Sequence, residues 1–298
     1  MGKIWRHLFF AIIAFSGQSI PLSAQSEVED AMFWEVRGKD LSSPSFLFGT
    51  FHLLGSRYVD SLTQVMNNFN QCKTFVGEIL IDSSMTMKMM IAARLDNTSL
   101  DKLLTPADYQ KTAVWLRELS GYELNMFNGM NPMAIQIFLM TMLQDKYFPS
   151  ENVSDDPMDI YFQKEGKRVG KKLVGLETFD TQIHALFTQF TLERQVAMLT
   201  KFVDEKEKAK GELIQLNKSY RNGNLSQLEL LLADQTYTKQ EAEVMLDLRN
   251  KQWIEQLPSL MKIQPTFVAV GALHLAGKNG LVNLLRQAGY TVTPMAVK

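Results

Sequence analysis

Two apolar segments near opposite ends of the chain share one layout. In residues 46–55 and 268–277, three apolar residues lead to a glycine, two further residues follow, and a histidine comes next, His52 or His274. Both segments are apolar enough to be buried strands, and in open α/β sheets sites form beyond the carboxyl ends of the strands. If the two strands are neighbours in one sheet, their imidazoles converge there. His52 and His274 are therefore the first candidate site residues.

Chance produces this layout only rarely. The chain contains 17 Gly and 4 His, so roughly a quarter of one Gly-x-x-His motif is expected at random. A single His after a strand is more often structural than a ligand, but a matched pair favours function. His7 lies in the N-terminal segment and is set aside. His184 lies on a helical stretch, where we expect a structural role.

The pattern around the two segments predicts an α/β (α+β) fold. Residues 33–36 alternate like a half-buried strand, and a helix over 58–71 leads to a second buried strand at 74–80, the unit of a parallel sheet. The middle is helical to about residue 257, apart from a short strand at 171–177, and the end holds a strand at 265–275, a helix at 281–287 and a strand at 290–294. No Pro- or Ser-rich linker divides the mature chain. We therefore expect one domain over 25–298, a central sheet with a large helical insertion.

The first residues have the pattern of a secretory signal peptide. Lys3 and Arg6 precede an apolar run at residues 8–15, and small and polar residues lead to Ala24. Because this run is too short to span a bilayer as a mature helix, a cleaved signal at 1–24 is favoured over a retained anchor. We expect a periplasmic or secreted protein with no stable membrane span after cleavage.

The composition excludes several classes of function. Hydrophobic residues make up 46% and charged residues 21% of the chain, and the net charge is -1, as in an ordinary globular protein. The chain has no excess of basic residues that could bind the phosphates of a nucleic acid, so no nucleic-acid partner is expected. A single cysteine cannot form an internal disulfide, and Cys72 is expected to be a buried small hydrophobe rather than a catalytic thiol. The methionines within 85–90 and 126–142 favour core filling over an adaptable peptide-binding surface.

Two carboxylates are the next candidates. Glu78 and Glu177 each lie at the end of a short apolar strand. A buried carboxylate must be paired, liganded or protonated because unpaired burial is costly. With His52 and His274 they form a donor set that suits zinc or manganese. Such an ion would lower the pKa of bound water and polarise a carbonyl. The alternative is a metal-free site in which one His activates water as general base, with a Glu beside it.

Several motifs in a fixed order resemble the TraB/GumN family. They are Gly49-Thr50-Phe51-His52, Glu78 after an apolar strand, Gly175-Leu176-Glu177-Thr178 followed by Gln182, Arg249-Asn250 with Trp253, and Gly271-Ala272-Leu273-His274 with Gly280-Leu281 and Gly289-Tyr290. The likeness runs from about Phe33 to Val292. The family includes the Wnt-cleaving metalloproteases called Tiki and is distantly similar to the erythromycin esterases.

The resemblance implies a pseudo-symmetric central sheet in which the two Gly-x-x-His motifs face each other. It implies that both histidines bind the metal, that Glu78 acts as ligand or general base, and that Glu177 has a weaker claim as a ligand. Arg249 and Asn250 would line the site in catalytic roles, Arg249 by stabilising an oxyanion or holding a carboxylate. In the Tiki branch, peptide cleavage depends on manganese or cobalt. We expect this chain to lack the membrane anchor of the animal Tiki proteins, which argues against a shared substrate.

We therefore expect an exported metal-dependent hydrolase, most simply a peptidase, acting on a peptide or small-molecule substrate. A divalent ion (Mn, Co or Zn), held by His52, His274 and Glu78 with Glu177 nearby, would activate water. Two alternatives use the same site. One is a non-catalytic protein that captures a peptide or signal molecule, and the other is a metal-free esterase of small molecules.

Overall fold

The computed structural model describes residues 30–149, 156–233 and 237–298. These residues form two compact units. The sheet unit is built from residues 30–81, 156–178 and 216–298, and the helical unit from residues 82–149 and 179–215. The chain enters each unit more than once, and the single domain expected over 25–298 stays a prediction. The signal peptide predicted for 1–24 lies outside the described residues.

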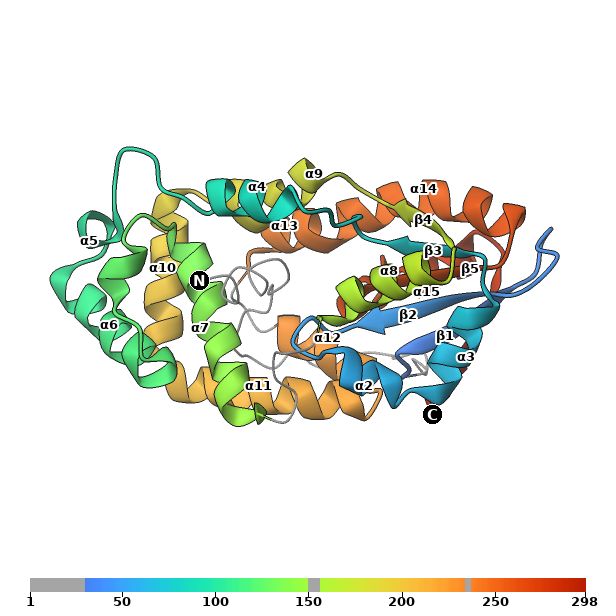
Figure 1. The fold of residues 1–298 in the computed structure, drawn as a ribbon, viewed down its shortest axis with the longest axis horizontal. Coiled ribbons are helices and arrows are strands. Elements are labelled where there is room, and N and C mark those ends of the chain that lie inside the picture. Colours follow the sequence, from blue (N-terminus) through green and yellow to red (C-terminus); the bar gives the residue numbers. More distant parts are fainter. Residues whose placement is uncertain (1–29, 150–155, 234–236) are drawn as a thin grey trace. The chain divides into compact units, whose positions relative to one another are not determined.

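The sheet unit contains a mixed six-stranded sheet, which confirms the expected α/β fold (Figure 1). Its strands are β1 (Phe33–Arg37), β2 (Ser45–Thr50), β3 (Thr74–Gly77), β4 (Lys172–Gly175), β5 (Thr266–Gly271) and β6 (Thr291–Met295). They lie in the order β4-β3-β5-β2-β1-β6. Strands β4, β3, β5 and β2 pair in parallel, whereas β1 pairs antiparallel with both β2 and β6. The four parallel strands therefore end at one common edge.

The two repeated segments lie side by side in this sheet. Strand β2 pairs in parallel with β5, with Gly49 opposite Val270 and Thr50 opposite Gly271. Both strands are shorter than their apolar runs, since β2 ends at Thr50 and β5 ends at Gly271. After Thr50 the chain turns, and Leu54 N donates a hydrogen bond to Phe51 O at 2.9 Å. Phe51 and Leu54 stay buried in that turn. An apolar run in the sequence therefore indicates which residues are buried, but it does not show where the strand ends.

An aromatic cluster holds two helices against one face of the sheet. Phe69 of α3 (Thr63–Gln71) and Phe162 of α8 (Met158–Arg168) lie with their ring centroids 5.2 Å from that of Phe267 on β5. Leu47 and Val268, which point to the other side of their strands, are also fully buried. Both faces of the parallel part are therefore covered, as such sheets require.

The remaining helices of the sheet unit follow the predicted order with one break. The helix expected over 58–71 is two helices, α2 (Ser56–Asp60) and α3, because Ser61 turns the chain by bonding back to Tyr58 O through both its backbone N–H and its hydroxyl. The others are α12 (Leu225–Ala233), α13 (Lys239–Ala242), a π-helical turn (Glu243–Asp247), α14 (Leu248–Ile263), a 3-10 turn (Ala272–His274) and α15 (Leu281–Gln287).

The helical unit is the expected insertion. Its helices are α4 (Met85–Ala92), α5 (Leu100–Leu103), a 3-10 turn (Leu124–Phe127), α6 (Pro106–Ser120), α7 (Pro132–Tyr147), α9 (Phe179–Ile183), a π-helical turn (His184–Thr188), α10 (Leu192–Asp204) and most of α11 (Lys206–Arg221). Met89, Met133 and Met140 are buried, which agrees with core filling, whereas Met87 and Met126 are exposed.

Replacing Thr105 with alanine is expected to destabilise the helical unit by about 1 kcal/mol, the usual cost of losing an N-cap. Thr105 Oγ1 accepts a hydrogen bond from Asp108 N at 3.1 Å at the start of α6, where Pro106 occupies the first helical position. Urea unfolding followed by circular dichroism measures the change. Thr105→Ser keeps the hydroxyl and is the matched control; equal losses in both variants would contradict the capping role.

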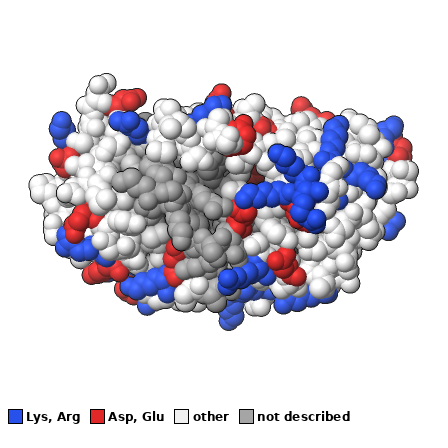
Figure 2. Space-filling view, viewed as in Figure 1, with Lys and Arg blue, Asp and Glu red and all other residues white. Residues whose placement is uncertain are grey.

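Charged side chains of both signs mix on the surface shown in Figure 2. Basic side chains gather over the region of α8 and β4, which carry Lys164, Lys167, Arg168 and Lys172. Acidic neighbours pair with some of them, as Asp156 does with Lys164 at 2.6 Å. Within the described ranges, no helix combines the length and apolarity needed to cross a bilayer.

Candidate functional site

The carboxyl ends of the parallel strands bring the predicted residues together. His52 follows β2, Glu78 follows β3, Glu177 follows β4 and His274 follows β5. A Cβ atom placed on Gly271 would lie 3.3 Å from Glu78 Oε1, 3.5 Å from His52 Nε2 and 3.7 Å from His274 Cδ2. The two imidazoles and the Glu78 carboxylate therefore meet beside the bare α-carbon of Gly271. This is the convergence that the repeated segments predicted.

His52 is paired with a carboxylate that the sequence did not single out. Its Nδ1 lies 2.6 Å from Asp159 Oδ2, and Thr50 Oγ1 donates to Asp159 Oδ1 at 2.8 Å. Burial lowers the pKa of His52, but the negative charges of Asp159 and Glu78 outweigh burial and raise the pKa above its ordinary value. With a side chain 22% exposed, His52 is more accessible than Glu78, His274 or Arg249, which are 5–7% exposed.

Arg249, in the first turns of α14, is the buried cation of the site. Its Nε and Nη2 bond the two oxygens of Glu177 at 2.9 and 2.7 Å, and Nη2 also bonds Glu78 Oε2 at 2.5 Å. Its Nη1 donates to Met245 O at 3.0 Å and lies 3.1 Å from His274 Nε2. A guanidinium has five N–H donors, so all five are used within the protein. Arg249 therefore holds protein carboxylates, which is one of the two roles expected for it.

His274 is fixed by hydrogen bonds at both ring nitrogens. Its Nε2 accepts from Arg249, so its proton lies on Nδ1, which donates to Asn250 Oδ1 at 2.7 Å. The Asn250 amide in turn donates to His274 O at 3.2 Å and to Asn279 O at 2.9 Å. Burial, together with the positive charge of Arg249, lowers the pKa of His274 to about 3. This imidazole is therefore neutral at physiological pH, with no free ring nitrogen.

Glu78 is buried and ionised. Burial raises the pKa of its carboxyl, but the charge of Arg249, the neighbouring imidazoles and the hydrogen bond from Gly271 N (2.8 Å) outweigh it and lower the pKa to about 2. The Oε2 atom faces Arg249, whereas Oε1 faces Gly271 and lies 3.9 Å from His274 Nε2. The site therefore presents a fixed negative charge to whatever approaches His52.

The expected metal ligands do not form a three-donor centre in this arrangement. Across the described part of the chain, no group of three or more His, Cys, Asp or Glu side chains is placed to hold a metal ion. His52 Nε2 and Glu78 Oε1 face the same place, but His274 Nε2 is bonded to Arg249 and both oxygens of Glu177 are bonded to the same guanidinium. Arg249 therefore supplies the positive charge beside these carboxylates.

Two other residues considered from the sequence lie apart from the site. Cys72 is buried, as expected, and burial raises the pKa of its thiol to about 12, so it stays unreactive. His184 belongs to the helical unit, where its Nδ1 lies 2.9 Å from Thr188 Oγ1. Neither residue contributes to the chemistry at the strand ends.

Asp159 is the site residue that the sequence analysis missed. It lies in the first turn of α8, in Asp156-Pro157-Met158-Asp159, a sequence that is typical of a helix start. Backbone hydrogen bonds from Ser56 N to Asp156 O (3.1 Å) and from Met158 N to Leu54 O (3.2 Å) hold this start against the turn that carries His52. The spacing of residues in the sequence does not predict the contact between Asp159 and His52, because that contact depends on backbone pairing between distant segments.

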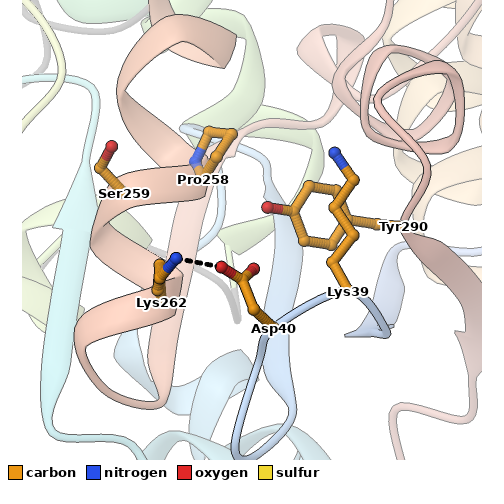
Figure 3. Close-up of a pocket in the computed structure, with 6 residues that line it drawn as sticks. All are labelled: Lys39, Asp40, Pro258, Ser259, Lys262 and Tyr290. Atoms are coloured by element: carbon orange, nitrogen blue, oxygen red, sulfur yellow. Dashed lines mark ion pairs between the residues drawn. The ribbon is translucent and has the colours of Figure 1, made fainter.

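A surface pocket lies at the opposite edge of the sheet. It has a volume of about 530 Å³ and is lined by Lys39, Asp40, Pro258, Ser259, Lys262 and Tyr290 (Figure 3). Lys262 forms an ion pair with Asp40 there, and the ammonium of Lys39 lies 4.9 Å from the centre of the Tyr290 ring. These residues precede β2, β5 and β6, whereas the candidate site follows the parallel strands. The pocket is therefore separate from the site.

The fold and the site together define a mixed α/β protein with a buried histidine–glutamate–arginine cluster at the carboxyl edge of its parallel strands. The chain belongs to the TraB/PrgY/gumN family, whose family model matches residues 32–294. It is 22% identical over 317 residues to the curated protein "Metalloprotease TIKI2" of Danio rerio. That match covers 88% of this chain and 60% of the relative, so the chain spans little more than half of it. No solved structure matches the chain significantly.

Proposed function

We propose that this chain is a hydrolase that activates water between His52 and Glu78, most simply to cleave peptide bonds. One observation carries the proposal: His52 Nε2 and Glu78 Oε1 face the same side of Gly271, 3.5 and 3.3 Å from where a Cβ would stand. A general base must lie within hydrogen-bond reach of the proton that it removes. A water bonded to both atoms at this position would meet that condition.

The roles of the other residues follow from their contacts. His52 Nε2 takes the proton from water as it attacks the substrate carbonyl, and returns it to the leaving group. Glu78, which is kept ionised, orients the water and stabilises the imidazolium that forms. Arg249 balances the charge of the two buried carboxylates, and Asn250 holds His274 in one tautomer. His274 then forms a neutral wall of the site.

Peptides are favoured as substrates because the similar Danio rerio protein is described as a metalloprotease. We propose export to the periplasm or the medium as the setting, on the pattern of the first residues. The non-catalytic alternative, capture of a peptide or signal molecule, uses the same strand ends. Pairing of the accessible His52 with a carboxylate favours catalysis, because binding alone requires no base.

A metal-dependent form of the reaction is the second candidate, and the relative's description supports it. His52 and Glu78 offer donor atoms on one side of Gly271, and His274 becomes a third donor only when Arg249 releases its Nε2. Metal analysis of the purified chain beside Arg249→Lys and His274→Ala separates the two forms. Metal bound stoichiometrically by the wild type and lost in His274→Ala would establish the metal-dependent form.

The test of the proposed function is hydrolysis of a broad peptide library by the full chain. It is run after EDTA treatment and again with Mn²⁺, Co²⁺ or Zn²⁺ added. Cleavage that His52→Ala abolishes supports the proposal, whether or not the ion is needed. Tight binding of peptides that remain intact under every condition would favour the non-catalytic alternative instead.

Replacing Gly271 with alanine is expected to lower hydrolysis by at least about tenfold, because the methyl group would stand where water and substrate meet. The backbone there (φ -50°) accepts an alanine, so the variant should fold. Gly49→Ala is the contrast: its Cβ would lie 2.9 Å from the backbone Cα of Ala272 and should destabilise the fold by about 1–3 kcal/mol. Activity assays and thermal melts of both variants check this, and full activity in Gly271→Ala would contradict the proposed position of the water.

A further inference from the structure

We infer that Asp159 is a positioning residue that fixes the tautomer of His52 and aims its Nε2 at the reacting water. The inference deepens the proposed function and rests on it for its meaning in catalysis. Its structural content is independent of any reaction. It states that the proton of the neutral His52 ring lies on Nδ1, and that the Asp159 carboxylate keeps it there.

The contacts of the carboxylate decide the tautomer. An ionised carboxylate only accepts hydrogen bonds, so the 2.6 Å contact between Asp159 Oδ2 and His52 Nδ1 requires the proton on Nδ1. The other oxygen is taken, because Thr50 Oγ1 donates to Asp159 Oδ1 at 2.8 Å. Both oxygens are thus oriented, and the lone pair of His52 is left on Nε2, the atom that faces Gly271 and Glu78.

The elements that carry these groups are held together by the backbone. Thr50 ends β2 and His52 follows it, while Asp159 lies in the first turn of α8. The hydrogen bonds of Ser56 N to Asp156 O and of Met158 N to Leu54 O join the two segments. A side chain of the first turn is therefore placed on the His52 ring by rigid elements, which is the condition for a preorganised site.

The second histidine of the repeat shows what Asp159 adds. His274 has the same position after β5, but its Nδ1 donates to the neutral amide of Asn250 and its Nε2 accepts from Arg249. Both nitrogens of His274 are used, and burial with the charge of Arg249 lowers its pKa. Of the two histidines of the repeat, His52 is the one whose Nδ1 is backed by a carboxylate. The repeated motif therefore has two unequal halves.

A structural role alone predicts something different. An acidic residue in the first turn of a helix stabilises the helix by its charge, and Asp159 lies in that turn. On this account, removing the carboxylate would lower stability and leave the His52 tautomer and the chemistry of the folded protein unchanged. The ring nitrogens of His52 are therefore the place to measure.

The experiment is ¹⁵N NMR of the histidine ring nitrogens in the full chain, in alkaline buffer where the rings are neutral. Wild type, Asp159→Ala, Asp159→Asn and Thr50→Val are compared, with the peptide assay run in parallel. We expect Nδ1–H at His52 in the wild type and loss of that preference in Asp159→Ala. The value of kcat/KM should fall about tenfold to 100-fold, as for misaligned catalytic groups, whereas the His274 signals stay unchanged as the internal control.

The conservative variants complete the test. Asp159→Asn keeps an acceptor oxygen and should retain most of the Nδ1–H form and more activity than Asp159→Ala, and Thr50→Val should have the smallest effect. An Nε2–H tautomer in the wild type, or an unchanged tautomer in the alanine variant, would overturn the inference. If the wild type cleaves no peptide, the proposed function fails while the NMR result still decides the role of Asp159. If Asp159→Ala does not fold, the wild-type tautomer and Asp159→Asn decide it.

Discussion

Replacing Arg249 with methionine is expected to destabilise the chain by about 3–5 kcal/mol, the cost of breaking a buried ion pair from one side. Its guanidinium bonds both oxygens of Glu177 and Oε2 of Glu78, and the three side chains are 2–7% exposed. Without it, two carboxylates remain close together with no cation between them. Chemical unfolding with urea, followed by tryptophan fluorescence, measures the change in free energy.

Matched variants separate this effect from a general loss of charge. Arg117→Met removes a guanidinium whose partner, Glu123, is 51% exposed, and should change stability little. Arg249→Lys keeps the charge but loses the two-pronged contact to Glu177, so its loss should be intermediate. Adding Glu78→Gln to Arg249→Met should recover part of the loss. A loss as small as that of Arg117→Met would show that the cluster is not held by Arg249.

The same substitution should change how stability depends on pH. In the wild type, the pKa of Glu78 is lowered from 4.5 to about 2, so its ionised form contributes stability above pH 4.5 that is lost as pH falls towards 2. Without Arg249, the effect of burial on Glu78 is no longer outweighed, and the pKa of its carboxyl should rise above its ordinary value. Stability of the variant then falls as pH rises. The gap between wild type and Arg249→Met should therefore widen from acidic to neutral pH, and a constant gap would contradict this account.

Much of the fold could be predicted from the sequence because burial and strand order leave clear patterns. The buried runs of β2, β3 and β5 all lie where the pattern placed them. The ends of the strands were less predictable. The turn after Thr50 stays apolar because its side chains remain in the core, and the break at Ser61 depends on hydrogen bonds that spacing does not encode.

The candidate site divides in the same way. His52, Glu78 and His274 could be predicted because parallel strands place their carboxyl ends at one edge, so residues that follow such strands must meet. Arg249 was reached only through resemblance to the family. Asp159 was missed because acidic residues are common in the first turn of a helix, so nothing in the sequence marks it as a site residue. Its contact with His52 joins two segments that only the folded backbone brings together.

These contacts give the repeated motif a physical meaning. The shared layout of strand, glycine and histidine brings two imidazoles to one place, but the neighbouring side chains decide what each imidazole does. The Asp159 carboxylate accepts a hydrogen bond from His52 Nδ1, whereas Arg249 and Asn250 bond the two ring nitrogens of His274. A symmetric layout in the sequence therefore produces an asymmetric site, in which one half is suited to proton transfer and the other to structure.

Replacing His52 with alanine is accordingly expected to lower kcat/KM for peptide cleavage by a factor of about 10² to 10⁴, the range for loss of a general base. The side chain is 22% exposed, and Asp159 keeps its hydrogen bond from Thr50, so the thermal midpoint should fall less than in His274→Ala. His274→Ala should behave differently. It leaves Arg249 Nη1 and the Asn250 amide without the ring that they bond, at a buried position, so stability should fall together with activity.

Kinetics and thermal melts of the two variants, with His184→Ala as a control at an exposed position, test this division of roles. Small imidazoles added to His52→Ala should restore part of the activity, because they can supply the missing base where the ring was, and should do nothing for His274→Ala. The reverse result, with rescue at position 274 and an unchanged rate after loss of His52, would place the base on the other half of the repeat. It would also require Arg249 to leave His274 Nε2 when the reaction takes place.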